Sequence, residues 1–313
     1  MGADDNRGMN NPIPDAGVAL VHLGVIRARG ADAVKFLQSQ LTNDVATLGL
    51  SQARLAGFCS AKGRLQASFI AWQPADDDVL LACSASVLPA TLKRLSMFVM
   101  RAQCKLSDAT AELSLRGFAG AAALRLAGDV RIWEKRDDAA ATVIRLPDST
   151  GLARCIVAGA PGDPSAVATV DAAAALDAWR WLEVQSGIPT IESATVDQFV
   201  PQMLNFEVLG GVDFQKGCYP GQEIVARSQY RGTIKRRMFL FDSAAPAVAG
   251  EEAFHDADPA QPAGMVVNAA PHPQGGWSAL VEVKLAALEG GALHLGSSAG
   301  AELERRELPY ALG

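Results

Sequence analysis

The sequence predicts an α+β fold in which two units of antiparallel sheet and helix precede a small β-barrel or sandwich. Two features of the chain predict this class. Up to about residue 232, alternating apolar and polar runs typical of strands are interleaved with segments of helical periodicity. From about residue 234 onward only short alternating runs remain, and Pro, Gly and Asp separate them, which is typical of an all-β module.

The first unit begins with an expected strand at residues 18–27, which ends before Gly30. A helix follows, for which Asp32 is the expected N-cap. Its apolar residues recur at helical spacing, at Val34, Leu37, Leu41 and Val45. Further strands are expected at 55–59, 65–72, 79–83 and 104–106. Between the last two of them, an amphipathic helix has the apolar face Leu88, Leu92, Leu95 and Val99.

The second unit is expected between about residues 113 and 195. Its strands are expected at 122–126, 130–133 and 155–157, followed by a surface turn at 158–164 and a helix at 170–185. The C-terminal strands are expected at 238–241, 264–267 and 279–285. The chain is therefore expected to divide into a disordered tail at 1–16, two interleaved α+β units at 17–232 and a β-barrel at 233–313.

Composition narrows the classes of function. A net charge of −6 and an isoelectric point near 5.3 argue against a general nucleic-acid binder, so no direct contact with nucleic acid is expected. No run of 18 apolar residues suggests a membrane helix, and the polar start does not resemble a signal peptide. The five cysteines are far apart and form no CxxC pair, so no zinc site or disulfide framework is expected, and a reducing cytoplasm fits best. The four histidines are expected to be structural or on the surface: His22, His255, His272 and His294.

Residues 216–223, KGCYPGQE, are the most informative stretch. Pro220 and Gly221 favour a tight turn, and the residues after it predict the start of a helix. Cys218 would then lie just before a helix N-terminus and between Lys216 and Arg227, an environment that favours a reactive thiolate. The alternative on this evidence alone is an ordinary buried cysteine.

Residues 199–205 and 210–223 together resemble the folate-binding YgfZ family, a branch of the larger group that includes the glycine-cleavage aminomethyltransferase. The resemblance extends to residues 36–45, 59–64 and 181–189, and so covers most of the chain. It implies an aminomethyltransferase-like, three-domain cloverleaf around a central folate channel. It also implies a bound tetrahydrofolate or a derivative, and partners that are iron–sulfur client enzymes or cluster-assembly proteins, including radical enzymes that modify tRNA.

Residue roles are carried over from this resemblance. Cys218 is expected to be the reactive group, and Lys216 to tune its thiol or to contact an anionic folate tail. The residues expected to bind folate are Glu183, Gln202, Asn205, Tyr219, Gln222, Glu223 and Arg227. No metal ligands are expected, since a single cysteine cannot hold an iron–sulfur cluster.

The chain also departs from the aminomethyltransferase pattern. In the resemblance, Gln66 and Ala67 occupy the positions at which those transferases have an acidic pair. Gln202 occupies the position at which they have a glutamate. An amide and a methyl group cannot supply the charge that such chemistry needs, which argues against a glycine-cleavage enzyme. Three functions stay open: an accessory protein acting through Cys218, a folate-dependent one-carbon transferase or demethylase using a carboxylate such as Asp44, and a scaffold in which the thiol is dispensable.

Overall fold

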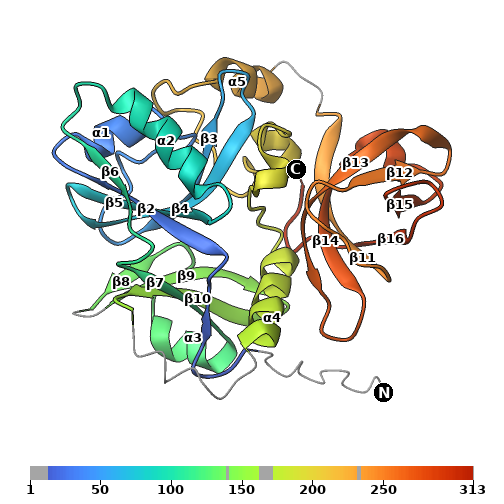
Figure 1. The fold of residues 1–313 in the computed structure, drawn as a ribbon, viewed down its shortest axis with the longest axis horizontal. Coiled ribbons are helices and arrows are strands. Elements are labelled where there is room, and N and C mark those ends of the chain that lie inside the picture. The colour runs from blue at the N-terminus through green and yellow to red at the C-terminus, as the bar shows by residue number, and fades with distance from the viewer. Residues whose placement is uncertain (1–12, 139–140, 162–171, 231–233, 313) are drawn as a thin grey trace.

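The structure is a computed structural model that describes residues 13–138, 141–161, 172–230 and 234–312. Two sheet lobes and a barrel lobe form a cloverleaf (Figure 1). Helix α4 (Ala172–Gln185) lies where the second sheet and the barrel meet, since it contacts β1 and β9 of that sheet and β13 and β14 of the barrel. The predicted α+β class with a C-terminal barrel is confirmed.

The first sheet has the strand order β3-β4-β5-β2-β6 and is antiparallel throughout. Its strands are β2 (Leu23–Arg29), β3 (Ala53–Cys59), β4 (Leu65–Ala75), β5 (Asp78–Ser84) and β6 (Lys105–Asp108). Helices α1 (Ala33–Gln38) and α2 (Leu88–Val99) cover one face. The face of α2 that carries Leu88 and Leu95 is buried, as its spacing predicts.

The predicted first helix and first strand need correction. Helix α1 ends at Gln38, because the side-chain carbonyl of Gln38 accepts a hydrogen bond from the Val45 amide and Leu41 pairs with Phe58 as an isolated β-bridge. Asp32 lies at the predicted N-cap position, but its carboxylate accepts a hydrogen bond from the Gln103 amide and caps no amide of its own helix.

The strand expected at 18–27 is two strands. β1 (Val18–Ala19) pairs with β7 of the second sheet, whereas β2 continues into the first sheet. The short link between them, which contains His22, therefore passes from one lobe to the other.

The second sheet has the order β1-β7-β10-β9-β8. Its remaining strands are β7 (Ser114–Ala119), β8 (Lys135–Asp137), β9 (Ala141–Ser149) and β10 (Leu152–Gly159). The strand expected at 122–126 is wrong, since this segment lies in helix α3 (Gly120–Ala127), whose alanines favour a helix. The strand expected at 130–133 is also wrong, because the chain turns there, with Trp133 at a positive φ of 63°.

The barrel closes in the order β11-β14-β13-β12-β15-β16. Its strands are β11 (Arg236–Ser243), β12 (Glu252–His255), β13 (Asp258–Pro271), β14 (Trp277–Lys284), β15 (Leu293–Leu295) and β16 (Glu302–Arg306). The expected boundary at 232/233 lies outside the described residues, as do residues 1–12 of the expected tail, part of the turn at 158–164 and the first two residues of the helix at 170–185.

From the end of α4 to residue 230, the chain forms short helices and loops. They include η2 (Ser193–Thr195), η3 (Pro201–Leu204) and α5 (Gln222–Tyr230); a further short helix, η4 (Leu285–Leu288), follows β14. α5 begins where the sequence predicts a helix after the Pro-Gly turn. In the part of the chain that is described, no helix is both long and apolar enough to cross a membrane.

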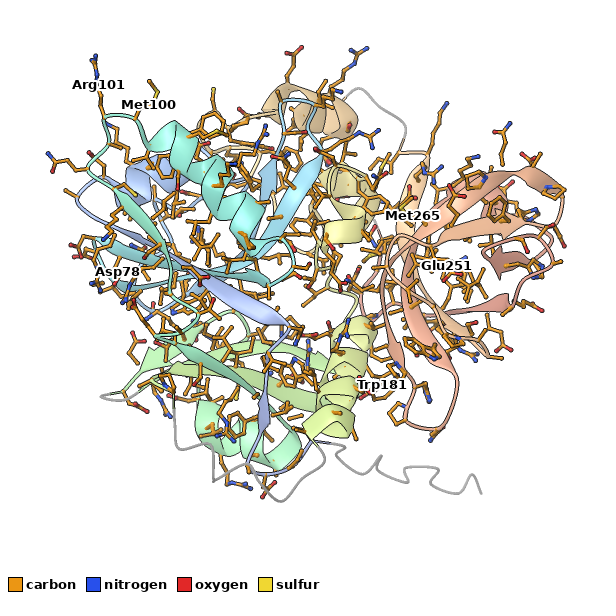
Figure 2. All side chains as sticks on the ribbon, viewed as in Figure 1. Asp78, Met100, Arg101, Trp181, Glu251 and Met265 are labelled. Carbon is orange, nitrogen blue, oxygen red and sulfur yellow. The ribbon has the colours of Figure 1, made fainter. Side chains whose placement is uncertain are left out.

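One hydrophobic core joins the three lobes. It contains Trp72 of the first sheet, Ile156 of the second, Trp179 of α4 and Leu280 of the barrel. Trp181, labelled beside the barrel in Figure 2, also donates from Nε1 to the Ser278 hydroxyl at 3.2 Å.

A buried ion pair adds a polar link between the barrel and the central segment. Arg237 of β11 donates to Glu207 at 2.6 Å, and both side chains are about nine-tenths buried. Near the C-terminus, the Tyr310 hydroxyl donates to the Gly187 carbonyl at 2.8 Å. The lobes are therefore held around a common centre by both apolar and polar contacts.

Candidate functional site

A small cavity, here called the inner chamber, lies between the two sheets and the C-terminal end of α4. Its free volume is about 50 Å³. Most of its wall is apolar and includes Leu55, Ile70, Trp133, Leu146, Ile156 and Ile188. Among the residues that the structure describes, two charged side chains line it, Glu183 of α4 and Arg154 of β10. An apolar cavity with a few convergent polar groups is the usual form of a small-molecule site.

Glu183 is held from two sides. Its Oε1 accepts a hydrogen bond from Trp179 Nε1 at 2.8 Å, and its Oε2 lies 3.0 Å from His22 Nε2. Burial alone would raise the pKa of Glu183, but His22, the Trp179 hydrogen bond and the charge of Arg154 outweigh it and hold that pKa below its usual value. Glu183 is therefore a carboxylate that can accept further hydrogen bonds from a ligand.

Arg154 is only 1% exposed. Its guanidinium lies over the Trp179 ring, 5.7 Å from the centroid, and its Nε donates to the Pro147 carbonyl at 3.1 Å. Burial lowers the pKa of Arg154 to about 10, against the opposing charge of Glu183. Its Nη1 has no hydrogen-bond partner among the described residues. Because an unpaired buried donor is costly, this nitrogen is suited to a ligand that supplies an acceptor.

A larger groove of about 520 Å³ adjoins the inner chamber and shares Leu55 and Trp133 with it. We call it the outer groove. Arg54, Arg131 and Asp213 contribute to its wall. Asp213 links this groove to the KGCYPGQE loop, because its Oδ1 accepts hydrogen bonds from the Gln215 and Lys216 amides.

Cys218 is the exposed member of a set of five free cysteines. Cys59, Cys83 and Cys155 are buried, and burial raises the pKa of each thiol to about 12. Such thiols are poor nucleophiles at neutral pH. Accessibility therefore favours Cys218 for any thiol chemistry, although its predicted thiolate character stays a prediction.

Lys216, the expected tuning residue, points inward. Its Nζ donates to the carbonyls of Gln38 and Leu41 beyond the end of α1, and it lies 5.1 Å from the centre of the Tyr219 ring. Burial lowers the pKa of Lys216 to about 8, although the charges of Asp44, Asp213 and Cys218 oppose that shift. Lys216 thus fixes the loop that carries Cys218 against the first lobe.

The turn after Cys218 packs on the β3–β4 hairpin. Gly221 has a φ of +80°, and a Cβ at this position would lie 2.4 Å from the Ser60 carbonyl oxygen. Gly63, in the hairpin, would meet Ile224 of α5 in the same way. The sequence predicts a glycine for the turn, but the close approach of two backbones is a second requirement that only the fold reveals.

Gln202 and Asn205 are completely buried behind α5 and the barrel. Gln202 Nε2 donates to the Val225 carbonyl at 2.8 Å, and Asn205 Nδ2 donates to the Met238 carbonyl at 2.8 Å. Gln202 Oε1 has no partner among the described residues. Neither residue lines the inner chamber or the outer groove, so both hold α5 and β11 in place.

The other predicted folate-binding residues lie on or just before α5. Tyr219 is buried against Lys216, Gln222 is half-buried, and Glu223 and Arg227 are exposed. Of all the residues predicted for the site, Glu183 alone lines the inner chamber. The structure thus separates two regions: Glu183 in the cavity, and the Cys218 loop with α5 outside it.

Sequence reasoning missed two residues around Glu183: Arg154, which lines the inner chamber, and His22, which does not line it. Arg154 carries no motif, and its role depends on how β10 faces α4. His22 was expected to be structural or on the surface, yet it contacts Glu183 across 161 residues of sequence. A histidine and a glutamate that are far apart in the chain give no local signal of this contact.

The two positions considered for transferase chemistry, Gln66 and Asp44, make hydrogen bonds within the protein. Gln66 donates to Asp197 at 3.1 Å, and Asp44 accepts hydrogen bonds from the Ala46 amide at 2.9 Å and the Thr47 hydroxyl at 2.7 Å. Burial would raise the pKa of Asp44, but these bonds and Arg54 hold it below its usual value. Across the described ranges, no three His, Cys, Asp or Glu side chains gather in a way that could hold a metal ion.

Comparisons with known proteins identify similar chains, although no family model matches. The chain is 30% identical to the tRNA-modifying protein YgfZ of Sodalis glossinidius strain morsitans, over 95% of this chain and 93% of that protein. It is 34% identical to the tRNA-modifying protein YgfZ of Edwardsiella ictaluri strain 93-146, over 68% of this chain and 67% of that protein. An uncharacterized protein of Haemophilus influenzae is 29% identical over 72% of each chain.

Among solved structures, the glycine cleavage system aminomethyltransferase T from Bartonella henselae is similar, with a TM-score of 0.72. The match covers 93% of this chain and 85% of that one at 20% sequence identity. At this identity the similarity establishes the fold and carries no statement about activity.

The buried amine of Lys216 predicts a specific pH dependence of stability. Native Lys216 releases its proton near pH 8, whereas an unfolded lysine does so near 10.5. Between these values the unfolded state binds more protons, so the free energy of unfolding should rise with pH. Relative to Lys216→Met, the wild type should gain on the order of 1–2 kcal/mol between pH 7.5 and 10, measured by urea denaturation. A difference between the two proteins that stays constant over this range would contradict the buried placement.

Two glycines of the KGCYPGQE loop provide a matched pair for a second prediction. Gly221→Ala should lower the free energy of unfolding by about 1–3 kcal/mol, because it combines an unfavourable φ with a backbone clash. At Gly217 an added Cβ meets nothing within 4 Å, so Gly217→Ala should change stability by less than about 0.5 kcal/mol. Equal effects of the two substitutions in denaturant melts would mean that the hairpin does not pack on this turn.

Proposed function

Because the chain belongs to the YgfZ family of tRNA-modifying proteins, we propose that it binds a tetrahydrofolate and supports iron–sulfur enzymes that modify tRNA, acting through Cys218. The observation that carries the folate part is the pair of charged groups in the inner chamber. Glu183 offers acceptors for the N–H edge of a pterin, and the unpaired Nη1 of Arg154 offers a donor for its carbonyl.

The size of the inner chamber adds a condition. Its free volume is only about 50 Å³, so we expect the ring to enter together with an outward movement of the wall. Leu55 and Trp133, which separate the chamber from the outer groove, are the side chains placed to move. Ligand binding would then depend on a conformational step.

The outer groove suits the remainder of a folate. Its 520 Å³ can take an extended tail, and its wall holds two arginines, Arg54 and Arg131, of which Arg131 pairs with Glu134 in the same wall. This assignment replaces Arg227 as the expected partner of the tail carboxylates, since Arg227 lies on the exposed side of α5. The segment that ends at Asp213 forms part of the groove and leads directly into the loop of Cys218, so a folate tail there would lie on the same loop that carries the thiol.

The thiol part of the proposal rests on exposure and on the rigid loop. Cys218 is accessible to another macromolecule, while Lys216 and Gly221 fix its loop on the first lobe. The partners proposed are iron–sulfur client enzymes or cluster-assembly proteins. A one-carbon transferase has less support, because Asp44 keeps its carboxylate within its own turn and Gln66 carries no charge.

Tetrahydrofolate should raise the thermal midpoint of the wild type by on the order of 5 °C at saturating concentration, because it binds only the folded state. Glu183→Gln removes a charged acceptor from the chamber and should weaken binding roughly 10- to 100-fold, measured by calorimetry. Glu252→Gln, an exposed carboxylate on the barrel, is the matched control and should bind like the wild type.

Two results would oppose this assignment. No binding of tetrahydrofolate by the wild type would remove the folate proposal altogether. Loss of binding in Arg227→Ala but not in Glu183→Gln would move the site from the inner chamber to α5.

A further inference from the structure

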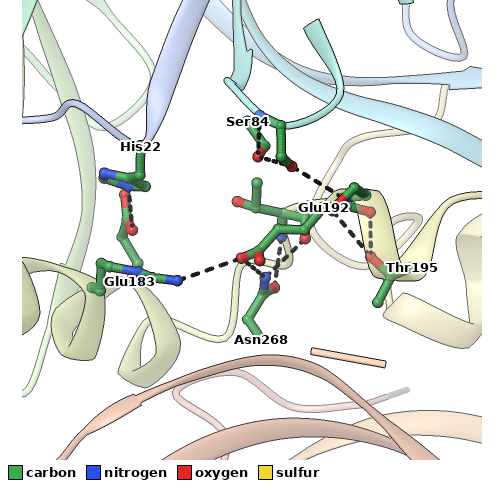
Figure 3. A network of polar contacts seen from close by, with 10 residues as sticks. His22, Ser84, Glu183, Glu192, Thr195 and Asn268 are labelled. Carbon is green, nitrogen blue, oxygen red and sulfur yellow. Dashed lines mark hydrogen bonds and ion pairs between the residues drawn. The ribbon is translucent and has the colours of Figure 1, made fainter. Parts of the chain in front are cut away.

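A second cavity lies on the other side of Glu183, where all three lobes meet. We call it the junction chamber; its free volume is about 200 Å³. Its wall includes Ser84 of the first sheet, Arg180 and Glu183 of α4, Glu192, and Asn268 of β13. Figure 3 shows His22 beside Glu183 and, across the chamber, Glu192 beside Asn268.

Two opposite charges in this wall are incompletely paired. Arg180 makes no hydrogen bond to any described residue, and its nearest carboxylate oxygen, Glu192 Oε1, is 3.8 Å from Nη2. Glu192 Oε1 accepts one hydrogen bond, from Asn268 at 3.1 Å, and the Glu192 side chain also takes part in a capping box with Thr195 at the start of η2. The Arg180 and Glu192 side chains are 37% and 29% exposed, so a solute can reach them.

The rest of the wall is small and of mixed polarity. The hydroxyls of Ser84 and Ser86 lie 2.8 Å apart, and Ser86 also accepts a hydrogen bond from the Ser193 amide. The apolar part consists of short aliphatic side chains: Ala85, Val184, Ile188 and Ala269. Such a surface can accept a short aliphatic group but has no aromatic platform.

We propose that the junction chamber binds a small α-amino acid as its zwitterion. The guanidinium of Arg180, which makes no hydrogen bond to a described residue, is suited to a carboxylate through paired hydrogen bonds, and the Glu192 carboxylate, which has further acceptor positions, is suited to an ammonium group. The 3.8 Å between Arg180 and Glu192 places the two charges next to each other, as they are in an α-amino acid. The short aliphatic wall then takes the side chain.

Simpler ions fit this wall less well. A phosphate or a dicarboxylate would meet Glu192 and Glu183, and a bare amine would meet Arg180. A zwitterion pairs with both signs and brings no net charge into a half-buried site, which limits the desolvation cost. The inference goes beyond the proposed folate function and does not depend on it.

Calorimetric titration of the full chain with glycine and L-alanine tests the proposal, with methylamine and acetate as half-ligands. Both amino acids should bind at least about 10-fold more tightly than either half-ligand, because only they satisfy both charges. Glu192→Gln and Arg180→Gln should each weaken glycine binding by about 10-fold or more, while Glu252→Gln should leave it unchanged.

Absence of glycine and alanine binding at millimolar concentration would overturn the proposal, as would half-ligands that bind equally well. Unchanged glycine binding in both Glu192→Gln and Arg180→Gln would also overturn it. If a variant fails to fold, the comparison of amino acids with half-ligands on the wild-type protein still tests the proposal. Tetrahydrofolate binding, measured on the same samples, separates the two proposals, since neither Glu192 nor Arg180 lines the inner chamber.

Discussion

Glu183 is a half-buried carboxylate, and the groups that compensate its charge organise the centre of the molecule. His22 reaches it from the link between β1 and β2, Trp179 from one turn earlier on α4, and Arg154 from β10. These groups fix the first lobe, the second sheet and α4 relative to one another. The same carboxylate separates the two chambers, so the contacts that hold the fold together also define where ligands can bind.

A second buried charge, Lys216, has the same effect on the surface loop. Its ammonium group is held by the Gln38 and Leu41 carbonyls, and Tyr219 covers it. An amine held in this way restricts the backbone on either side, and Gly221 restricts it further by direct packing on the β3–β4 hairpin. Cys218 is therefore exposed to solvent on a loop that is held in place on both sides.

The sequence predicted the features that depend on local pattern. The hairpin around Gly63, the apolar face of α2, the start of α5 and the three barrel segments expected at 238–241, 264–267 and 279–285 follow from periodicity or turn chemistry. Local pattern failed where tertiary contacts decide, since Leu41 leaves the helical register to pair with Phe58. Arg154 could not be found at all, because its contact with Trp179 joins segments that are far apart in the chain.

We propose that the thiol of Cys218 serves tRNA modification. The most direct measurement is the activity of an iron–sulfur tRNA-modifying enzyme in cells that lack this protein, complemented with wild type, Cys218→Ala or the half-buried control Cys104→Ala at equal abundance. We expect wild type and Cys104→Ala, but not Cys218→Ala, to restore the activity of that enzyme. Full rescue by Cys218→Ala would contradict it and assign the cysteine a structural role.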